Sequence, residues 1–419
     1  MQHWKHITHY AGLDWASDHH DVVVVDQQGR IKLTLRIAHS AEGWNLLQAK
    51  LSQLGNVAVA VENNHGMAVE QLLSHDLETY PVNPMCAQRY RERKSPSGVK
   101  NDQLDAWSLA DALRLDGHGW KRLVADDPLV GELRLLTRDE VNLIEQRTAF
   151  TNQLIASLRD YYPAAVEAFE DWTLPAAWAF VERFPTPQAL VKAGKRAWEK
   201  FLHAHKLYRP ETYQHRLEIF ARADQFAGTT AVTAARSLLA TSLAVMLRTV
   251  NLQLEKYRER IQTVFSQHPE HHIFASLPGI GPKLGPRLMA ELGSDREHFD
   301  SAQSLQCFAG TAPVTIQSGK FSKCIMRRAC QLRLRAAVHL WANLSRSSCP
   351  WAQVYYRAHR AKGQSHACAL RCLGQRWLKI LWKMWQTRKP YDADFHARNQ
   401  QQHGSWVLKL EPSSADKTV

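Results

Sequence analysis

The placement of β-branched residues constrains the fold of this chain more than any other feature. Two apolar runs rich in valine, Val22–Val25 and Val57–Val61, have the composition of buried strands. Between them, residues 31–37 alternate apolar and polar side chains, as a half-buried strand does. From about Asp127 to Phe265 these strand signals vanish, and leucines recur at helical spacing. The pattern predicts an N-terminal α/β domain followed by helical parts.

The order of the predicted elements narrows the fold of the N-terminal domain. They are strands at 7–14, 22–25 and 31–37, a helix at 40–54, a strand at 57–61, a helix after Gly66, a strand at 80–82 and a helix at 103–115. The early hairpin implies antiparallel pairing, whereas the later helical crossovers imply parallel pairing. A mixed sheet covered by helices results, in the order of the RNase H-like fold.

The rest of the chain is expected to form further domains, because 419 residues exceed what a single hydrophobic core supports. Leucines at helical spacing among polar residues indicate a middle section that is partly coiled coil and mediates oligomerisation. The predicted sections are an α/β catalytic domain at 5–126, the helical section at 127–268, a mostly α C-terminal domain at 269–390 and a polar tail at 391–419.

The charge balance points to a polyanionic partner. Lys and Arg total 53 against 40 Asp and Glu, a formal net charge of +13. Nucleic acid is the commonest partner of such a chain, although a solvated basic surface is the alternative. The polar first residues predict no secretory signal, and no apolar run reaches the roughly 18 residues of a membrane span. A cytoplasmic protein with no membrane contact is therefore expected.

Four carboxylates fall where the predicted fold would bring them together. Asp14 ends the first predicted strand and Glu62 ends the fourth, while Asp102 and Asp105 share one face of the last helix. Such a cluster needs cations to neutralise it, and carboxylate oxygens suit Mg²⁺ or Mn²⁺. Two ions roughly 4 Å apart would activate a nucleophile and stabilise the leaving oxygen at a phosphodiester.

Each acid alone also has an ordinary structural interpretation. Asp14 could cap a turn, Glu62 could be a surface residue, and Asp102 could cap the helix. Only the combination of two strand ends with an acidic pair on a helix is informative. Four further acids lie nearby in the sequence and are not assigned to the site: Asp18, Asp21, Asp26 and Asp111.

Basic residues and glycines mark candidate contacts with nucleic acid. The first group flanks a predicted flexible loop at 95–98 and comprises Arg89, Arg91, Arg93, Lys94 and Lys100. The second is a glycine turn that could present backbone N–H groups to a phosphate, with Gly279, Gly281 and the nearby Lys283. The third comprises Lys320, Lys323, Arg327, Arg328 and Arg335, of which Arg328 and Arg335 could share a helix face. Solvated loops and faces, and a plain helix-entry turn, are the alternatives.

Several of these motifs together carry a family likeness. Gly12-Leu13-Asp14, Val61-Glu62 and Lys100-Asn101-Asp102-Gln103-Leu104-Asp105 resemble the DEDD-type insertion-sequence transposases, which have a RuvC-like N-terminal domain. Leu277–Pro282 is similar to that family's helix-hairpin-helix-like segment, and Gln317-Ser318-Gly319-Lys320 to its C-terminal transposase domain. One departure is that Asn63–His65 stands between the second acid and Gly66, where the family has a shorter segment.

The resemblance implies a mechanism and partners. Asp14, Glu62, Asp102 and Asp105 would bind the metal, and the Ser318 hydroxyl would attack DNA and become joined to a phosphate. It also implies double-stranded donor and target DNA, a structured noncoding bridge RNA as guide, and a homodimer or homotetramer at the bacterial or archaeal nucleoid. The residues alone favour an ordinary turn at Ser318-Gly319, and only the resemblance favours the nucleophile.

Two other functions remain open at this point. A RuvC-like junction nuclease would use metal-bound water as its nucleophile, with Ser318 in a structural role. A nucleic-acid-binding protein would retain the basic surface without metal chemistry. A covalent protein–DNA adduct separates the recombinase from the nuclease, and metal-dependent cleavage separates both from the binding protein.

Overall fold

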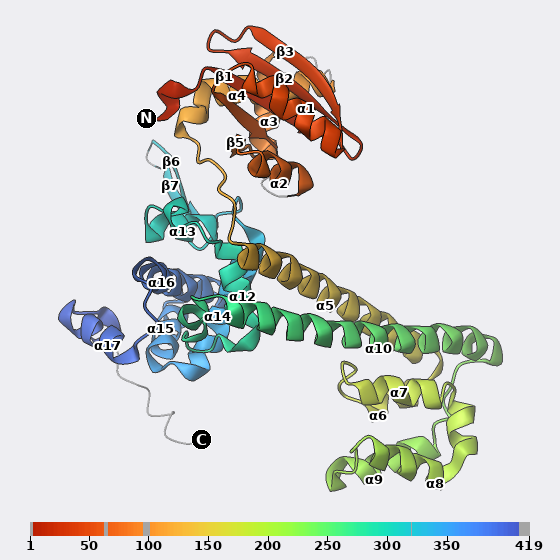
Figure 1. Cartoon of the computed structure of the whole chain (residues 1–419). Coiled ribbons are helices and arrows are strands. Elements are labelled where there is room, and N and C mark those ends of the chain that lie inside the picture. The colour runs from red at the N-terminus through yellow and green to blue at the C-terminus, as the bar shows by residue number, and fades with distance from the viewer. Residues whose placement is uncertain (1–2, 63–65, 95–100, 320, 410–419) are drawn as a thin grey trace. The chain divides into compact units, whose positions relative to one another are not determined.

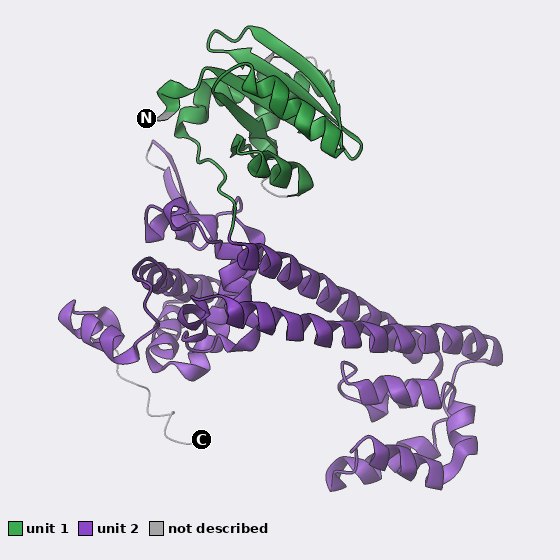
Figure 2. Cartoon of the chain, in the orientation of Figure 1, with its two compact units in different colours: residues 1–126 green, residues 127–419 purple. Residues whose placement is uncertain are grey.

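The computed structural model describes residues 3–62, 66–94, 101–319 and 321–409. The chain divides into two compact units, Met1–Asp126 and Asp127–Val419 (Figure 2). The first unit is an α/β domain and the second is almost entirely helical.

A five-stranded mixed sheet forms the centre of the first unit (Figure 1). Its spatial order is β3-β2-β1-β4-β5, in which β1 pairs antiparallel with β2 and parallel with β4, β2 pairs antiparallel with β3, and β4 pairs parallel with β5. The strands are β1 (His9–Trp15), β2 (His19–Asp26), β3 (Ile31–Ala38), β4 (Val57–Val61) and β5 (Glu78–Pro81). The predicted RNase H-like fold is confirmed.

Helices cover both faces of this sheet and bury its alternating side chains. One face, with Leu13 and Val59, packs against α1 (Ala41–Ser52) and α2 (Met67–Ser74). The opposite face, with Tyr10 and Ala60, packs against α4 (Asp102–Asp116). Short 3-10 turns, η1 (His3–His6) and η2 (Gly117–Gly119), lie near the ends of the unit's chain.

Gly12 lets α4 lie unusually close to the central strand. A Cβ at this position would come within 2.0 Å of the Ala106 carbonyl oxygen and 2.6 Å of the Ala110 nitrogen. Any side chain at position 12 would therefore push the helix away from β1. This close approach fixes where the first turn of α4 meets the end of β1.

The basic residues at 89–94, which flank the predicted flexible loop, lie in a helix. Helix α3 spans Pro84–Lys94, and the Asn83 side chain accepts a hydrogen bond from the Met85 backbone nitrogen at 2.9 Å. Residues with high helix propensity follow, among them Gln88 and the arginines of this stretch, and they extend the helix. The predicted loop at 95–98 lies outside the described residues.

Two long helices, α5 (Pro128–Tyr161) and α10 (Thr230–Gln267), run side by side through the second unit (Figure 1). Between them in sequence come α6 (Pro163–Ala168), α7 (Pro175–Arg183), α8 (Pro187–Ala204) and α9 (Pro210–Ala221). These four helices, each beginning with proline, share a separate core with the adjoining parts of the long pair. The sequence predicts a helical middle section that Pro163, Pro175, Pro185 and Pro187 break into pieces, and α6, α7 and α8 begin at three of these prolines.

Helix α10 is a candidate membrane span by its length and composition. Of the described helices, it alone meets the length and composition for crossing a membrane, with a mean hydropathy of 1.5 and 28% of that window buried. Its apolar residues are interspersed with Ser and Thr, so no continuous apolar run marks it in the sequence. A single such helix is weak evidence, and α5 and α7 pack against it within the protein.

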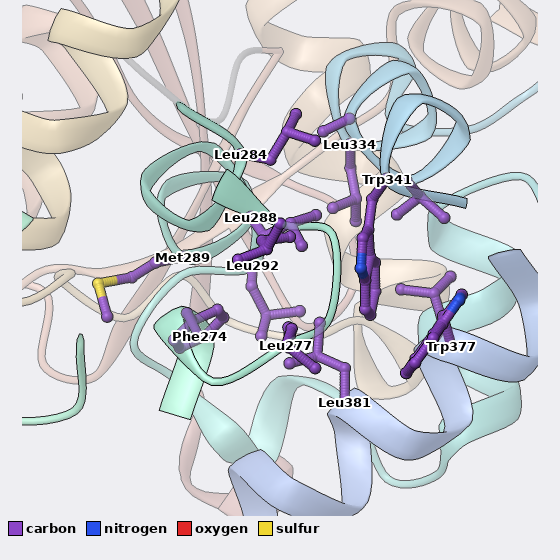
Figure 3. Close-up of a cluster of buried hydrophobic side chains, with 14 of the residues drawn as sticks. Phe274, Leu277, Leu284, Leu288, Met289, Leu292, Leu334, Trp341, Trp377 and Leu381 are labelled. Carbon is purple, nitrogen blue, oxygen red and sulfur yellow. The ribbon is translucent and has the colours of Figure 1, made fainter. Parts of the chain in front are cut away.

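The C-terminal part of the second unit surrounds a core that contains Trp341 and Trp377 (Figure 3). Val130 of α5 and Ile261 of α10 belong to this core, so one end of each long helix packs within it. The elements are α11 (His271–Ala275), α12 (Gly281–Leu292), η3 (Arg296–His298), α13 (Ala302–Phe308), β6 (Val314–Ser318), β7 (Phe321–Ile325), α14 (Leu332–Ser348), α15 (Pro350–Ala361), α16 (His366–Thr387), α17 (Ala393–Gln402) and η4 (Trp406–Lys409). The β6–β7 hairpin is absent from the sequence prediction, because its largely exposed strands lack the burial that produces a clear pattern.

Candidate functional site

The sheet brings the two predicted strand-end acids side by side. Asp14 is the penultimate residue of β1, and Leu13 pairs with Val61 at the end of β4. Glu62 follows Val61 directly, so it continues the register alongside Asp14. Both residues continue the sheet face whose apolar members pack against α4.

Helix α4 supplies the other two acids from its first turn. The Asn101 side chain caps this helix by accepting a hydrogen bond from the Gln103 nitrogen at 2.9 Å. Asp102 is exposed, whereas the Asp105 side chain retains only 13% of its accessible surface. The four predicted acids line one cavity of about 710 Å³, which α3 closes on one side with Pro84, Met85, Gln88 and Arg91.

The electrostatics of Asp14 reflect this crowding. Burial, followed by the negative charges of Asp105, Asp102, Glu62 and Asp21, raises its pKa to about 6. Each neighbouring carboxylate therefore disfavours the ionised form of Asp14, and a bound cation would reverse that effect. The four acids act as one electrostatic group.

A fifth carboxylate, Asp21, which the sequence analysis left unassigned, lines the same cavity. It is the direct cross-strand partner of Asp14 and is 3% exposed. Ligand atoms of His19, Asp21 and Asp102 all lie within 4.8 Å of one another, which is close enough to hold a metal ion. The signal that could have revealed Asp21 is the hairpin register, because residues 14 and 21 flank one short β-turn.

Two arginines neutralise part of this negative charge. The Arg36 guanidinium donates to both Asp21 oxygens, at 3.1 and 2.7 Å, and lies 3.4 Å from Asp102. Arg91 donates from Nη1 to Asp105 Oδ1 at 2.8 Å. Arg91 was predicted to contact nucleic acid, but in this structure it binds a carboxylate of the cavity.

The residues present fit a divalent cation with oxygen ligands. Carboxylates from three strand ends and one helix converge on the cavity, where burial and the neighbouring negative charges raise the pKa of Asp14. Hard oxygen donors suit Mg²⁺, and His19 would be better tolerated by Mn²⁺. Such a site could hold one or two ions at a phosphodiester.

Ser318 lies in the second unit, at the end of β6. It pairs with Phe321 of β7, and Gly319 occupies the intervening turn with a φ of +56°. The side chain is exposed, and no described residue forms a hydrogen bond with its hydroxyl. The acids belong to the first unit, so Ser318 and the carboxylates lie in different compact parts of the chain.

The predicted glycine turn connects α11 and α12. Gly279 has a φ of +72°, and a Cβ there would come within 2.8 Å of the Ser345 backbone in α14. Close packing against α14 thus explains why position 279 is a glycine. A Cβ at Gly281 would meet no atom within 4 Å, so packing does not explain that glycine. Lys283 is exposed in the first turn of α12. Whether this turn binds phosphate as a helix-hairpin-helix does stays a prediction.

The remaining basic residues are mostly exposed. Arg89 and Arg93 lie on α3 and Lys323 on β7. Arg327 and Arg328 precede α14, so the predicted helix face shared by Arg328 and Arg335 is wrong, because the helix begins only at Leu332. Arg335 instead donates to the Arg327 carbonyl oxygen at 3.3 Å. The structure does not describe Lys100, Lys320 or the side chain of Lys94.

The first unit thus combines an RNase H-like sheet with a cavity that carboxylates line at the strand ends. Comparison with known families matches residues 11–163 to the DEDD transposase family of IS110 and residues 271–357 to the family described as "Transposase IS116/IS110/IS902 family". The chain is 34% identical over 398 residues to the "Mini-circle putative transposase for IS117" of Streptomyces coelicolor, covering 92% of this chain and 96% of that protein.

Two further insertion-element proteins are also similar to this chain. The "Insertion element IS900 uncharacterized 42 kDa protein" of Mycobacterium paratuberculosis is 28% identical, covering 91% of this chain and 96% of that protein. The "Insertion element IS110 uncharacterized 43.6 kDa protein" of Streptomyces coelicolor is 27% identical, covering 71% of this chain and 73% of that protein. The chain belongs to the IS110 family of insertion-sequence transposases and is a DNA transposase.

Proposed function

We propose that this transposase is a Mg²⁺-dependent recombinase that cleaves and exchanges DNA strands through a covalent bond between Ser318 and a DNA phosphate. The observation that carries the metal part is the cavity in which burial and the charges of Asp105, Asp102, Glu62 and Asp21 raise the pKa of Asp14. Divalent ions, when bound there, would stabilise the negative charge that develops on the phosphate oxygens. Mn²⁺ is expected to substitute for Mg²⁺.

The carboxylates have the positions needed for this role. Asp14 and Glu62 would hold ions from the rigid strand ends, while Asp102 and Asp105 would do so from the first turn of α4. Rigid elements hold ligands more precisely than loops. Asp21, opposite Asp14, would be a further ligand or would orient the others.

Ser318 suits the nucleophile because its hydroxyl is exposed on a narrow hairpin that can reach into DNA. In the proposed step, a bond forms between its Oγ and the phosphorus, and one phosphorus–oxygen bond to deoxyribose breaks. The serine proton leaves to a base, and the departing sugar oxygen is protonated. Attack by the hydroxyl of another DNA end would reverse the step and join a new strand.

The partners follow from the chemistry and the resemblance. Donor and target double-stranded DNA are the substrates, with basic residues such as Arg328 on the phosphate backbone. A structured bridge RNA would select the sites, and a homodimer or homotetramer would handle the DNA ends in the cytoplasm, at the nucleoid. Because Ser318 and the acids lie in different units, two subunits could share one site.

Trapping the covalent adduct tests the proposal. Wild-type protein, DNA and guide RNA with Mg²⁺ should give a protein–DNA species that survives denaturing electrophoresis. Ser318→Ala should bind DNA and give no adduct, whereas Ser322→Ala, an exposed serine on the same hairpin, should retain it. Metal-dependent cleavage by Ser318→Ala at the wild-type rate would instead support the nuclease that uses water.

Sequencing the RNA that copurifies with the protein tests the guide. A single structured species encoded beside the transposase gene is expected. A heterogeneous mixture of cellular RNA would contradict guidance by a dedicated RNA.

A further inference from the structure

A second cavity, of about 700 Å³, lies in the C-terminal part of the second unit, between α16, the segment after it and α17. Its volume is within the range of pockets that hold small ligands. None of the predicted site residues lines it, and none of the carboxylates discussed above belongs to it. The function proposed above leaves this cavity unexplained.

Aromatic side chains form much of its wall. Trp351 and Tyr391 are held in place, since the Trp351 Nε1 donates to the Tyr391 hydroxyl at 3.2 Å. The His396 ring packs edge-on against Trp351, with 4.9 Å between the ring centroids. Phe395, by contrast, is 56% exposed and has no ring partner among the described residues. A flat apolar surface is thus open beside a rigid aromatic wall.

Positive charges surround these rings. Arg376, Lys379 and Lys383 lie three and four residues apart on α16, so they share one face of that helix, and Lys389 follows its end. Within the described chain, none of the three lysines has a carboxylate within ion-pair distance. The one acid in the lining, Asp392, caps α17 by accepting from the Phe395 nitrogen at 2.8 Å. The net charge of the lining therefore favours an anionic ligand.

Polar groups complete the lining. Asn399 and Gln400 carry side-chain amides that no described group engages in a hydrogen bond, and both residues are half-buried. An amide can both donate to and accept from the edge of a nucleobase. The combination of flat rings, amides and lysines matches the three parts of a nucleotide: base face, base edge and phosphate.

We propose that this cavity binds an unstacked nucleotide of single-stranded nucleic acid, with its base against Phe395 and its phosphates beside Lys379, Lys383 and Lys389. The proposal rests on the proposed function only in taking nucleic acid as the ligand. An apolar peptide would use the rings but leave the lysines without a role. The site gives the transposase a means of holding an unstacked strand.

Fluorescence anisotropy with labelled oligonucleotides tests this site. The probes are a short single-stranded DNA, an RNA of the same sequence, and an abasic DNA of equal length that keeps the phosphates and lacks bases. The measurement uses the full chain without divalent metal, so it does not depend on strand cleavage. Binding of the base-containing probes with roughly tenfold higher affinity than the abasic one is expected, since stacking on one ring contributes about this much.

Two variants and a control locate the effect. Phe395→Ala should lower affinity for the base-containing probes roughly tenfold and leave the abasic probe unchanged. Lys383→Glu should weaken binding of all three probes, and the weakening should shrink at high salt. Phe226→Ala removes a ring that is 78% exposed elsewhere in the unit and should change nothing.

The outcomes separate this site from the proposed function. Equal affinity for abasic and base-containing probes, or no effect of Phe395→Ala, would overturn the nucleotide site while leaving the adduct assay untouched. A preference for RNA over DNA would assign the cavity to the guide, and the reverse would assign it to a substrate strand. If the protein shows the expected anisotropy results but forms no covalent adduct through Ser318, only the recombinase mechanism is refuted.

Discussion

The replacement Asp14→Asn should stabilise the metal-free protein at neutral pH. The ionised carboxylate is disfavoured in the folded state, where burial and four neighbouring acids raise its pKa from 3.8 to about 6. At about 1.36 kcal/mol per pKa unit, that rise corresponds to about 3 kcal/mol of lost stability above pH 6. The side chain is only partly buried, so solvent screening reduces the effect to about 1–2 kcal/mol.

The sign of the pH dependence follows from the direction of this shift. Because the folded state holds the Asp14 proton up to a higher pH than the unfolded state does, wild-type stability falls as pH rises from about 4 to about 6. The asparagine variant lacks this loss. Its advantage should therefore be complete above about pH 6 and absent below about pH 4.

Urea denaturation in the presence of EDTA, at pH 7.5 and at pH 4, measures this advantage. The matched control is Glu70→Gln, which neutralises an exposed carboxylate on α2 outside the cavity. With saturating Mg²⁺ the order should reverse, since wild type gains stability from binding the ion and the variant gains less. An asparagine variant less stable than wild type without metal at pH 7.5 would refute the electrostatic account of the cavity.

Further predictions follow from the same geometry. Gly12→Ala should destabilise the first unit by about 1–3 kcal/mol or more, because its Cβ would overlap the Ala106 carbonyl, as thermal unfolding would show; an unchanged melting temperature would contradict the close packing of α4. Arg36→Ala should raise Mn²⁺ affinity about fivefold, because it removes a cation that competes for the carboxylates, and weaker calorimetric binding would argue against that role. Replacing Lys323 and Arg328 together should weaken binding to unrelated DNA sequences by the same factor. The slope of log affinity against log salt concentration should also become less steep, by the amount expected for about two phosphate contacts. A loss of affinity confined to one sequence would instead indicate base recognition.

Much of the first unit could be predicted from the sequence, because β1, β2 and β4 are buried on both faces and carry strong local patterns. Val57–Val61 was placed to the residue, and the mixed order followed from the lengths of the connections. The same reasoning identified Asp14 and Glu62 as strand-end acids whose neighbouring strands would bring them together. Their convergence with α4 depends on Gly12, whose packing role only the structure reveals.

The parts that escaped prediction depend on contacts between distant segments. Asp21 looks like any acid that starts a strand until the hairpin register sets it opposite Asp14. Arg91 has the composition of a nucleic-acid contact, and only the packing of α3 against α4 shows that it pairs with Asp105. The β6–β7 hairpin is exposed on most of both strands, so no alternation of burial marked it.

The central claim is that the carboxylate cavity binds divalent ions, and Mn²⁺ binding followed by electron paramagnetic resonance tests it most directly. Wild-type protein should bind Mn²⁺ and release it to excess Mg²⁺. Asp14→Asn and Asp105→Asn should each abolish or strongly weaken this binding, whereas Ser318→Ala should bind as wild type does. Mn²⁺ affinity that is unchanged in both carboxylate variants would contradict the account, because the ions would then lie elsewhere.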